Sequence, residues 1–572
     1  MGTNRVCHMK RLITASTVAV GFVAVIYAEV LYNGIVLPEK WPPRIDPNSR
    51  APLRVPYLDR QNIPTSIPID IGRQLFVDDF LVASSTGVVR KFNKPVKYIG
   101  NPVMWPETKA ELDEYERPPD CTMRAPGCCM PGGGVWWDPT RRRFRMWYLS
   151  GWNGALSLAE SADGLKWERP RVGPNGDNVL LPGLTVDTFS VWPDYSADNP
   201  YANWRLFIAP PGCPVRSRQF VSSDGCHWTA VDAGGKVGDS STLFYNPFRR
   251  KWVWSVRHYW SGNRCRVYRE HEGFIKGAVW KSATKDDIRS GRYDADGKAE
   301  VFPWLACDDA DITRTIDGTV RKPQLYNVDA TPYESLMVGL FKIICGRDNR
   351  ESEKMGMPKT TTIHFAYSRD GFHFDRPDRT PAIADSDWGS GAWDTGYLGP
   401  CSSGFVIKDE ELWFYYVGAR GDGTNKGWPN NGMHANFAVG IAKLRRDGFA
   451  GMVADGAGEI VTRPVVFSGS HLFVNADARF GALTAEVLDA DGRPYPGYTA
   501  EDCGGLERVD STKRAVSWKG GNLACFAGKP VRFRFRMNVA TLYAFWVSKD
   551  RSGKSGGYLA AGGPSYTGLR DD

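Results

Sequence analysis

A short motif, Ser-x-Asp-Gly-x-x-aromatic, recurs along the chain and limits its fold more than any other feature. Full copies lie at residues 161–167, 222–228 and 368–374, and weaker copies lie at 269–274 and 445–449. Because Asp-Gly favours a tight turn between two strands, each copy predicts a hairpin with an aromatic side chain packed behind its turn. Copies at intervals of roughly 50–100 residues are typical of a β-propeller, in which each repeat belongs to one four-stranded blade.

A second repeat, of aromatic-rich hairpins, alternates with the first. Each hairpin has a strand, a turn and a second strand, and its turn carries Asp138, Asp194, Asn246, Asp329 or Asp409. Five such hairpins predict five blades. The acids at these turns are interpreted as turn formers, and so are the acids of the Asp-Gly motif, Asp163, Asp224 and Asp370.

Length and composition favour an all-β chain with more than one domain. At 572 residues the chain is too long for one compact core. Its 61 Gly, 38 Pro and 12% aromatic residues favour strands and turns. We expect a five-bladed β-propeller at residues 71–455, followed by a C-terminal β-sandwich at 456–572. In the latter, the run 531–537 alternates apolar residues with Arg, as a half-exposed strand does.

The N-terminal sequence predicts export. Arg5, Lys10 and Arg11 precede an uncharged run at 12–28. Residues 1–31 are therefore interpreted as a signal peptide or as an uncleaved membrane anchor, and both alternatives stay open. The protein is expected in the periplasm, outside the cell, or tethered to a membrane through residues 12–28. The proline-rich stretch 32–70 predicts an extended, semi-rigid linker.

Charge and cysteine content exclude several classes of partner and cofactor. The 72 basic and 64 acidic residues give a net charge of +8 without a basic block, so no nucleic-acid partner is predicted. The twelve cysteines have no metal-binding spacing, and Cys503 and Cys525 either pair or remain buried thiols. His271 and Glu272 lack a third ligand, so we predict no metal site and no cofactor. The sequence does not indicate an oligomeric state.

Two aspartates occupy equivalent positions in neighbouring blades. Asp187 lies seven residues before Asp194, and Asp239 lies seven before Asn246. The leading ends of the inner strands converge on the propeller axis, so both side chains are expected in one axial funnel. A pair of carboxylates in a cleft suits acid/base cleavage of a glycosidic bond. The alternative is structural: each carboxylate accepts backbone N–H groups from the Ser/Thr residues that follow it.

Other candidates lie near the same strand ends. Asp120 and Asp394 are candidate third catalytic acids. Candidate substrate-binding residues are the hydrogen-bond donors Arg124, Arg257, His258 and Lys322, and the sugar-stacking side chains Trp136, Trp192 and Trp393. For the charged residues the alternative is a surface or turn position, and for the tryptophans it is packing within a blade.

Several stretches resemble a known family of enzymes. They are 74–81, 134–139, 144–148 and 325–335 in the propeller, and 463–467, 471–475 and 485–489 in the C-terminal region. The chain is similar in these stretches to glycoside hydrolase family 32 and its five-bladed relatives, and most similar to exported bacterial proteins predicted to be family-32-like glycosidases. The resemblance covers residue 71 to the C-terminus. It implies a propeller followed by a β-sandwich and hydrolysis of a carbohydrate substrate.

The catalytic segments of that family are not reproduced here. Family 32 enzymes carry Asn-Asp-Pro-Asn-Gly, Arg-Asp-Pro and Glu-Cys segments at inner strands. Asp239 corresponds to the second, between Gly238 and Ser240, but residues 131–134 read Pro-Gly-Gly-Gly at the first. At the position of the third segment, Glu-Cys, residues 322–324 read Lys-Pro-Gln, and Glu334 lies beyond the turn. We therefore expect a glycosidase with differently placed acids, Asp187 and Asp239, or alternatively a carbohydrate-binding propeller without catalysis.

Overall fold

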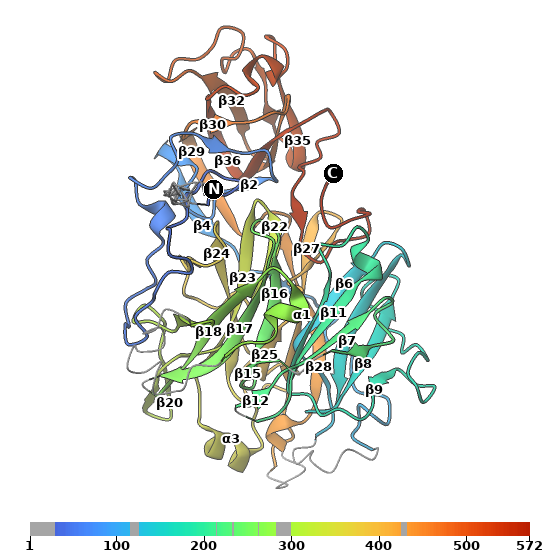
Figure 1. Ribbon diagram of the computed structural model, residues 1–572. Helices are drawn as coiled ribbons and strands as arrows, with labels where there is room; N and C mark the ends of the chain where they lie inside the picture. Colours follow the sequence, from blue (N-terminus) through green and yellow to red (C-terminus); the bar gives the residue numbers. More distant parts are fainter. Residues whose placement is uncertain are drawn as a thin grey trace, which may run out of the picture.

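The computed structural model describes residues 29–114, 125–212, 214–231, 234–260, 262–281, 299–424 and 432–572. Strands dominate these residues and form five blade-like sheets in a ring, with a larger C-terminal sheet beyond one end of the ring (Figure 1). The prediction of an all-β, five-bladed propeller is confirmed.

Each blade is an antiparallel sheet whose first strand is the innermost. Blade 1 contains β6 (Cys128–Asp138), β7 (Arg143–Ser150), β8 (Ala155–Ser161) and β9 (Val179–Leu181). Blade 2 contains β10 (Thr188–Pro193), β11 (Trp204–Ala209), β13 (Arg218–Ser222) and β14 (Thr229–Ala230). Blade 3 contains β16 (Thr242–Asn246), β17 (Lys251–Trp260), β18 (Asn263–His271) and β19 (Phe302–Ala306). Blade 4 contains β22 (Gln324–Glu334), β23 (Leu336–Ile344) and β24 (Thr361–Ser368). Blade 5 contains β25 (Gly396–Pro400), β26 (Val406–Lys408), β27 (Glu411–Ala419) and β28 (Phe437–Arg445).

Segments from outside the blades complete two of them. In blade 5, β5 (Val96–Lys97) pairs with β28 as the outer strand. In blade 4, β37 (Tyr558–Leu559) pairs with the inner strand β22. The propeller is therefore completed by one segment that precedes blade 1 and by one segment near the C-terminus.

The Asp-Gly motif forms the predicted turns. In the first copy the Ser161 hydroxyl accepts the N–H of Gly164 at 2.8 Å, and Asp163 accepts the N–H groups of Leu165 and Lys166 at 2.8 and 2.9 Å. The chain then returns, so that Glu160 and Glu168 pair across the turn. The copy at 269–274 differs, because the short helix α1 (Phe274–Gly277) begins where the other copies turn back.

These turns also join neighbouring blades. The indole N–H of Trp147 in blade 1 donates to the Gly225 carbonyl in the blade 2 turn at 2.8 Å. Trp304 in blade 3 donates in the same way to Phe372 in blade 4 at 2.8 Å, and the Tyr415 hydroxyl in blade 5 donates to Gly164 in blade 1 at 2.7 Å. The motif therefore explains the turns in blades 1, 2 and 4 and supplies contacts between blades 1 and 2, 3 and 4, and 5 and 1.

The C-terminal region is one ten-stranded sheet around its own hydrophobic core. The long β36 (Arg532–Ser548) pairs with β29 (Ala450–Thr462) on one edge and with β31 (His471–Asp477) and β32 (Ala482–Leu488) on the other. The remaining strands of the sheet are β2 (Gln74–Leu75), β3 (Val82–Thr86), β4 (Val89–Phe92), β33 (Cys503–Gly504), β34 (Leu506–Glu507) and β35 (Asp510–Trp518).

This pairing shifts the predicted domain boundaries. Strand β29 crosses the expected boundary between residues 455 and 456 without interruption. Residues 74–92, expected in the propeller, instead supply three strands to the C-terminal sheet, because they pair with β29 and β36. The two parts of the fold exchange strands and do not meet at a single point in the sequence.

The remaining elements are short. They are the 3-10 helices η1 (Pro56–Leu58), η2 (Pro200–Ala202), η4 (Gly432–His434) and η5 (Leu523–Phe526), the helix α3 (Asn349–Met355), and the paired strands β1 (Ile67–Pro68) with β30 (Val465–Val466), β12 (Val215–Arg216) with β15 (Lys236–Val237), and β20 (Arg314–Ile316) with β21 (Thr319–Arg321).

The proline-rich stretch 32–70 is not a free spacer. Its apolar side chains, among them Ile35, Leu37 and Tyr57, are buried in the core of the C-terminal sheet. It also contacts blade 4, where the side-chain amide of Asn33 donates to the Arg369 carbonyl at 3.0 Å. The expectation of an extended linker is wrong because burial of these side chains outweighs the stiffness of the prolines.

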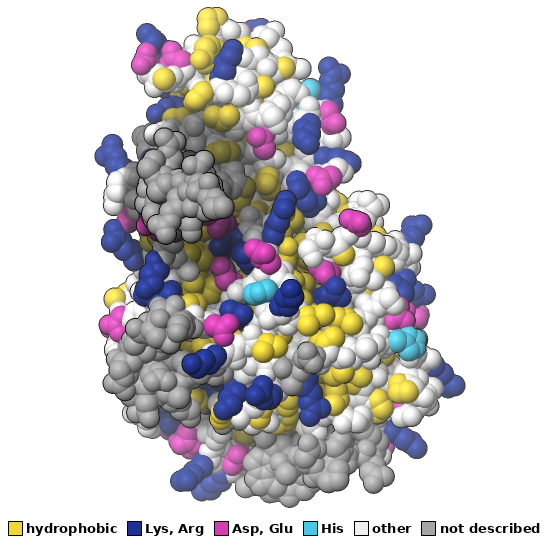
Figure 2. Space-filling model, in the orientation of Figure 1, with side chains coloured by type: hydrophobic (Ala, Val, Ile, Leu, Met, Phe, Trp, Pro, Cys, Tyr) yellow, Lys and Arg dark blue, Asp and Glu magenta, His cyan; other side chains and the backbone are white. Residues whose placement is uncertain are grey.

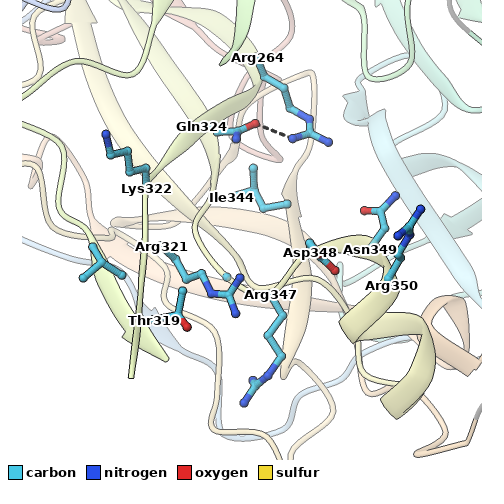
Figure 3. Close-up of a pocket in the computed structure, with 12 residues that line it drawn as sticks. Arg264, Thr319, Arg321, Lys322, Gln324, Ile344, Arg347, Asp348, Asn349 and Arg350 are labelled. Atoms are coloured by element: carbon cyan, nitrogen blue, oxygen red, sulfur yellow. Dashed lines mark hydrogen bonds between the residues drawn. The ribbon is translucent and has the colours of Figure 1, made fainter. Parts of the chain in front are cut away.

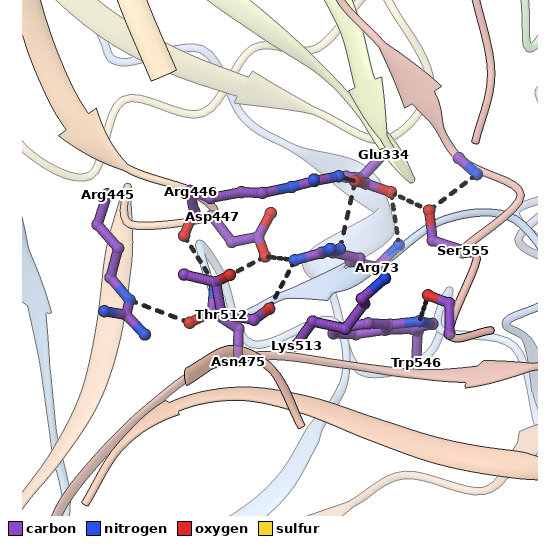
Figure 4. A network of polar contacts seen from close by, with 12 residues as sticks. Arg73, Glu334, Arg445, Arg446, Asp447, Asn475, Thr512, Lys513, Trp546 and Ser555 are labelled. Atoms are coloured by element: carbon purple, nitrogen blue, oxygen red, sulfur yellow. Dashed lines mark hydrogen bonds and ion pairs between the residues drawn. The ribbon is translucent and has the colours of Figure 1, made fainter. Parts of the chain in front are cut away.

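A buried polar network joins the propeller to the C-terminal sheet (Figure 4). Arg73 forms ion pairs with Asp447 at 2.7 Å and Glu334 at 3.5 Å, and Glu334 also pairs with Arg446 at 3.0 Å. The Arg73 guanidinium lies 4.1 Å from the ring centroid of Trp546 on β36. Asp447, in the weak fifth copy of the Asp-Gly motif, therefore has a structural role.

The surface and the N-terminus add little further constraint. Acidic and basic side chains are interspersed on the face shown in Figure 2. Cys503 and Cys525 do not pair with each other, and the interpretation of Cys525 as a buried thiol is wrong because its side chain is exposed. No helix within the described ranges is long and apolar enough to cross a membrane, and the run 12–28 lies outside those ranges.

Candidate active site

The structure brings Asp187 and Asp239 together at the axis of the propeller. Asp187 immediately precedes β10 and Asp239 lies three residues before β16, so both stand at the leading ends of inner strands. One oxygen of Asp187, Oδ1, accepts the backbone N–H of Ser240 at 2.9 Å and the hydroxyl of Thr188 at 2.8 Å. Among the described residues no group donates to the other oxygen, Oδ2.

The two carboxyl groups differ in charge environment. Burial and then the nearby charge of Asp239 raise the pKa of Asp187 to about 6. Asp239 instead forms an ion pair with Arg257, whose guanidinium lies 4.3 Å from the ring centroid of Tyr259. A carboxyl group that keeps its proton to about pH 6 therefore lies beside one that is paired with a cation.

Aromatic and basic side chains from blades 4 and 5 surround this pair. Tyr326 lies on β22, Lys342 on β23, Lys359 just before β24, and Tyr397 on β25. The Lys342 and Lys359 ammonium groups lie 5.1 and 5.8 Å from the Tyr326 ring centroid. The charge of Asp187 acts on both lysines and both tyrosines, and the charge of Asp239 acts on Lys359 and both tyrosines. These groups therefore lie close together. We call Asp187, Asp239, Arg257, Tyr326, Lys342, Lys359 and Tyr397 the axial cluster.

Burial lowers the pKa of each lysine to about 8, so both remain mainly protonated at neutral pH. Burial raises the pKa of Tyr326 and Tyr397 above the usual range, so both phenols stay neutral donors. The cluster therefore combines acids, cations and hydroxyl groups.

Asp329 belongs behind this cluster and not on a turn. It lies inside β22, is fully buried, and accepts the Asn327 amide at 2.7 Å, while the β22–β23 turn is formed by Glu334 and Ser335. Burial raises the pKa of Asp329 to about 7, against the charge of Arg266. The interpretation of Asp329 as a turn former is wrong because β22 continues five residues beyond it.

Backbone strain occurs at two positions of the site. Ser240 has φ 56° and Tyr397 has φ 50°, in the left-handed region that favours glycine. Each costs of order 1–3 kcal/mol, and such strain concentrates at functional sites. At Ser240 this conformation accompanies the hydrogen bond from its N–H to Asp187.

The prediction that Trp136 and Trp192 stack on a sugar is wrong. Trp136 and Trp192 are fully buried and pack against each other edge to face, with ring centroids 5.0 Å apart. The Trp136 indole donates to the Val191 carbonyl at 2.8 Å. Both side chains belong to the packing between blades 1 and 2 and have no face free for a sugar.

Asp394 and Trp393 also have structural partners. Asp394 is buried, pairs with Lys97 at 2.7 Å and accepts the Tyr416 hydroxyl at 2.9 Å. Trp393 packs on Tyr416 with ring centroids 5.3 Å apart. Asp394 therefore holds β5 against blade 5 and does not join the axial cluster.

The other predicted residues do not lie together. Arg257 belongs to the axial cluster, as described. His258, next to it on β17, accepts the N–H of Tyr259 through Nδ1 at 2.8 Å. Lys322 is exposed and lines a separate pocket. Asp120 and Arg124 lie outside the described residues.

That separate pocket has a volume of about 560 Å³ and is rich in basic side chains (Figure 3). Its lining includes Arg264, Arg321, Lys322, Arg347 and Arg350, which define the basic pocket. It includes residues of α3, which lies at the end of the propeller away from the C-terminal sheet (Figure 1). Arg264 connects it to the axial cluster, because its charge contributes to lowering the pKa of Lys359.

Sequence reasoning missed Tyr326, Tyr397, Lys342 and Lys359. Lys342 could have been identified from the sequence, because it is the one charged residue in the apolar run 339–344. The strand that contains this run is buried throughout. Lys359 and the two tyrosines had no such signal. Among the described residues no group of three or more His, Cys, Asp or Glu side chains is placed to hold a metal ion.

No family model matches the chain, and no curated protein matches it. Among solved structures, it is similar to an N-acetylgalactosamine deacetylase from F. plautii, with 12% identity, 64% of this chain and 97% of that chain covered, and a TM-score of 0.38. It is also similar to a putative glycoside hydrolase from Bacteroides ovatus, with 10% identity, 62% and 97% covered, and a TM-score of 0.37. A third is the Bombyx mori GH32 beta-fructofuranosidase, with 9% identity, 77% and 95% covered, and a TM-score of 0.35.

Proposed function

We propose that this protein is a glycoside hydrolase whose axial cluster cleaves a glycan. The observation that carries the proposal is the meeting of two unlike carboxyl groups from neighbouring blades. Asp187 keeps a proton to about pH 6 and has one oxygen without a hydrogen bond from the described residues. Asp239 forms an ion pair with Arg257. Glycosidases use such a pair, with one acid and one ionised carboxylate.

In the proposed reaction Asp187 donates its proton to the glycosidic oxygen as the bond from that oxygen to the anomeric carbon breaks. Asp239 acts on the opposite side, either by taking a proton from the attacking water or by attacking the anomeric carbon before water releases the sugar. The products are an alcohol and a new reducing end, and no oxidant or reductant is needed. The anomeric configuration of the released sugar distinguishes the two roles of Asp239.

The hydrogen bonds to Asp187 Oδ1 orient the carboxyl group for this step. The Ser240 N–H reaches it from the adjacent blade, so the geometry of the acid depends on the residue next to its partner Asp239. The neutral hydroxyl groups of Tyr326 and Tyr397 supply donors to sugar oxygens.

The second candidate function is carbohydrate binding without catalysis. The ion pair between Asp239 and Arg257 favours it, because a carboxylate paired with a guanidinium is a weaker base and nucleophile. The family segments missing from 131–134 and 322–324 favour it too.

One experiment separates these functions. The full chain and its Asp187→Asn, Asp239→Asn double variant are assayed for reducing-sugar release on a broad glycan panel, with Asp163→Asn, a variant in a blade turn, as the matched control. Release by the wild type and the control, and its loss in the folded double variant, supports hydrolysis. Glycan binding without release from any substrate would instead establish a binding protein.

We also propose that the protein is exported, on the basis of the basic and apolar residues at 5–28. Fractionation of cells that express the full chain tests this. Recovery with the cytoplasmic fraction alone would contradict it.

A further inference from the structure

Two buried lysines in the axial cluster form no ion pair with any of the described residues. Lys342 is 7% exposed and Lys359 is 6% exposed. Within the described chain neither ammonium has a hydrogen bond or an ion pair, and their contacts are the faces of Tyr326 and Tyr397 at 5.1–5.9 Å. Lysine is almost never this deeply buried without a partner, because removing its charge from water is costly.

The charges around these lysines do not balance. Of the three neighbouring acids, Asp239 pairs with Arg257 and Asp329 is balanced by Arg266, while the charge of Asp187 acts on both lysines without forming an ion pair with either within the described residues. In all, five basic side chains face three acidic ones, an excess of two positive charges when all are ionised: Arg257, Arg264, Arg266, Lys342 and Lys359 against Asp187, Asp239 and Asp329. His434 adds no charge beside Lys359, because burial and then Lys359 lower the pKa of His434 to about 3.

The lining of the basic pocket also has more basic than acidic side chains, five against one, Asp348. Gln324 accepts a hydrogen bond from Arg264 at 2.5 Å (Figure 3). Arg321 pairs with Glu351 at 2.7 Å, and Arg347 pairs with Asp317 at 2.5 Å. These contacts hold three of the guanidinium groups that line the pocket. Lys322 adds an exposed ammonium group beside them.

We infer that the substrate is an anionic glycan, with a carboxylate or sulfate group bound between Lys342 and Lys359 and further anionic groups in the basic pocket. This inference rests on the proposed function, because it names the substrate of the same site. An anion of this kind supplies the partner that both ammonium groups lack, and it lies beside the two acids that act on the bond. Uronic acids and sulfate esters share this chemistry.

The test compares anionic with neutral glycans on the full chain. Binding of polygalacturonate, carrageenan and a neutral galactan is measured by calorimetry at low and high salt. The proteins compared are the wild type, the single variants Lys342→Met and Lys359→Met, the double variant that carries both substitutions, and Lys443→Met. Lys443 is the matched control, since its ammonium also lies over an aromatic ring, 4.3 Å from the Trp413 centroid, but on the outer part of blade 5. Polygalacturonate carries only carboxylates and carrageenan only sulfates, so the two distinguish the source of the anion.

We expect binding of one anionic glycan that weakens with salt, and a loss of about tenfold or more in affinity for each lysine removed, because hydrogen bonds to charged groups are worth that much. The control should bind as the wild type does. A further measurement needs no variant. At constant ionic strength, inorganic sulfate should compete with the glycan for binding to the wild-type protein. Preference for the neutral glycan, or a double variant that binds the anionic glycan within about twofold of the wild type, would overturn the inference.

The outcomes also separate the inference from the proposed function. Binding of an anionic glycan without bond cleavage would support the inference and overturn the hydrolase assignment. Cleavage of a neutral glycan that is unaffected by the lysine substitutions would do the reverse.

Discussion

The network that joins the propeller to the C-terminal sheet gives a quantitative prediction for Arg73→Met. Arg73 is 2% exposed and is the closest cation to Asp447, at 2.7 Å. Removal of one partner from a buried ion pair typically costs about 3–5 kcal/mol of unfolding free energy. Asp447 keeps hydrogen bonds from Tyr333 at 2.6 Å and Asn475 at 2.9 Å, and Glu334 keeps Arg446. We therefore expect a loss near the lower end of that range.

The loss should depend on pH. Arg73 and Arg446 hold the pKa of Asp447 below its ordinary value, so its ionisation stabilises the fold above the unfolded-state pKa of about 4, and this contribution is lost as the pH falls through the folded pKa. Without Arg73 the Asp447 carboxylate is poorly compensated, and protonation relieves it. The variant should therefore be most destabilised at pH 8 and less so at pH 5.

Urea unfolding at the two pH values, followed by tryptophan fluorescence, checks this. Arg143→Met is the control, because the ion pair of Arg143 with Glu168 is 37% and 73% exposed and is worth at most about 1 kcal/mol. Equal destabilisation of Arg73→Met at both pH values would refute the electrostatic reasoning and point to lost packing on Trp546.

Three further outcomes are expected. Glycan hydrolysis by the wild type should fall as the pH rises through about 6, because Asp187 then loses the proton it donates; a rate that is flat from pH 5 to 8 on a substrate with a poor leaving group would contradict this. Trp147→Phe should lower the unfolding free energy by about 1–3 kcal/mol, because the buried Gly225 carbonyl loses its donor between blades 1 and 2; calorimetric melting measures it, and no change would remove the linking role of the motif. Trp136→Ala should cost about 3–5 kcal/mol as a core truncation and leave the glycan affinity of the folded protein unchanged, and a selective loss of affinity would restore Trp136 to the site.

Most of the propeller could be predicted because its signals are local. An Asp-Gly turn needs only its own residues to form, as the hydrogen bonds of Asp163 show. The same local regularity located Asp187 and Asp239, since each lies a fixed distance before a turn residue. In blade 4 the turn at Glu334 and Ser335 carries no such signal, and Asp329 was therefore misplaced.

The remainder depends on contacts that are distant in sequence. Residues 74–92 join the C-terminal sheet only because β29 and β36 offer edges to them. Both faces of an inner strand are buried in a propeller, so polar and apolar residues do not alternate along it. The sequence therefore could not show that Trp136 and Trp192 pack between blades. Lys359 could be assigned to the site only from its contacts with Tyr326 and Tyr397, which lie on different strands.

The central claim, that Asp187 donates a proton to the leaving group, is tested most directly by the Asp187→Asn variant on two substrates of the same sugar. The natural glycan has a poor leaving group that needs an acid, and a dinitrophenyl glycoside has one that does not. We predict that the rate on the glycan falls by about 10²–10⁴-fold while the rate on the dinitrophenyl glycoside changes little. An equal loss on both substrates, or full activity on the glycan, would contradict the assignment.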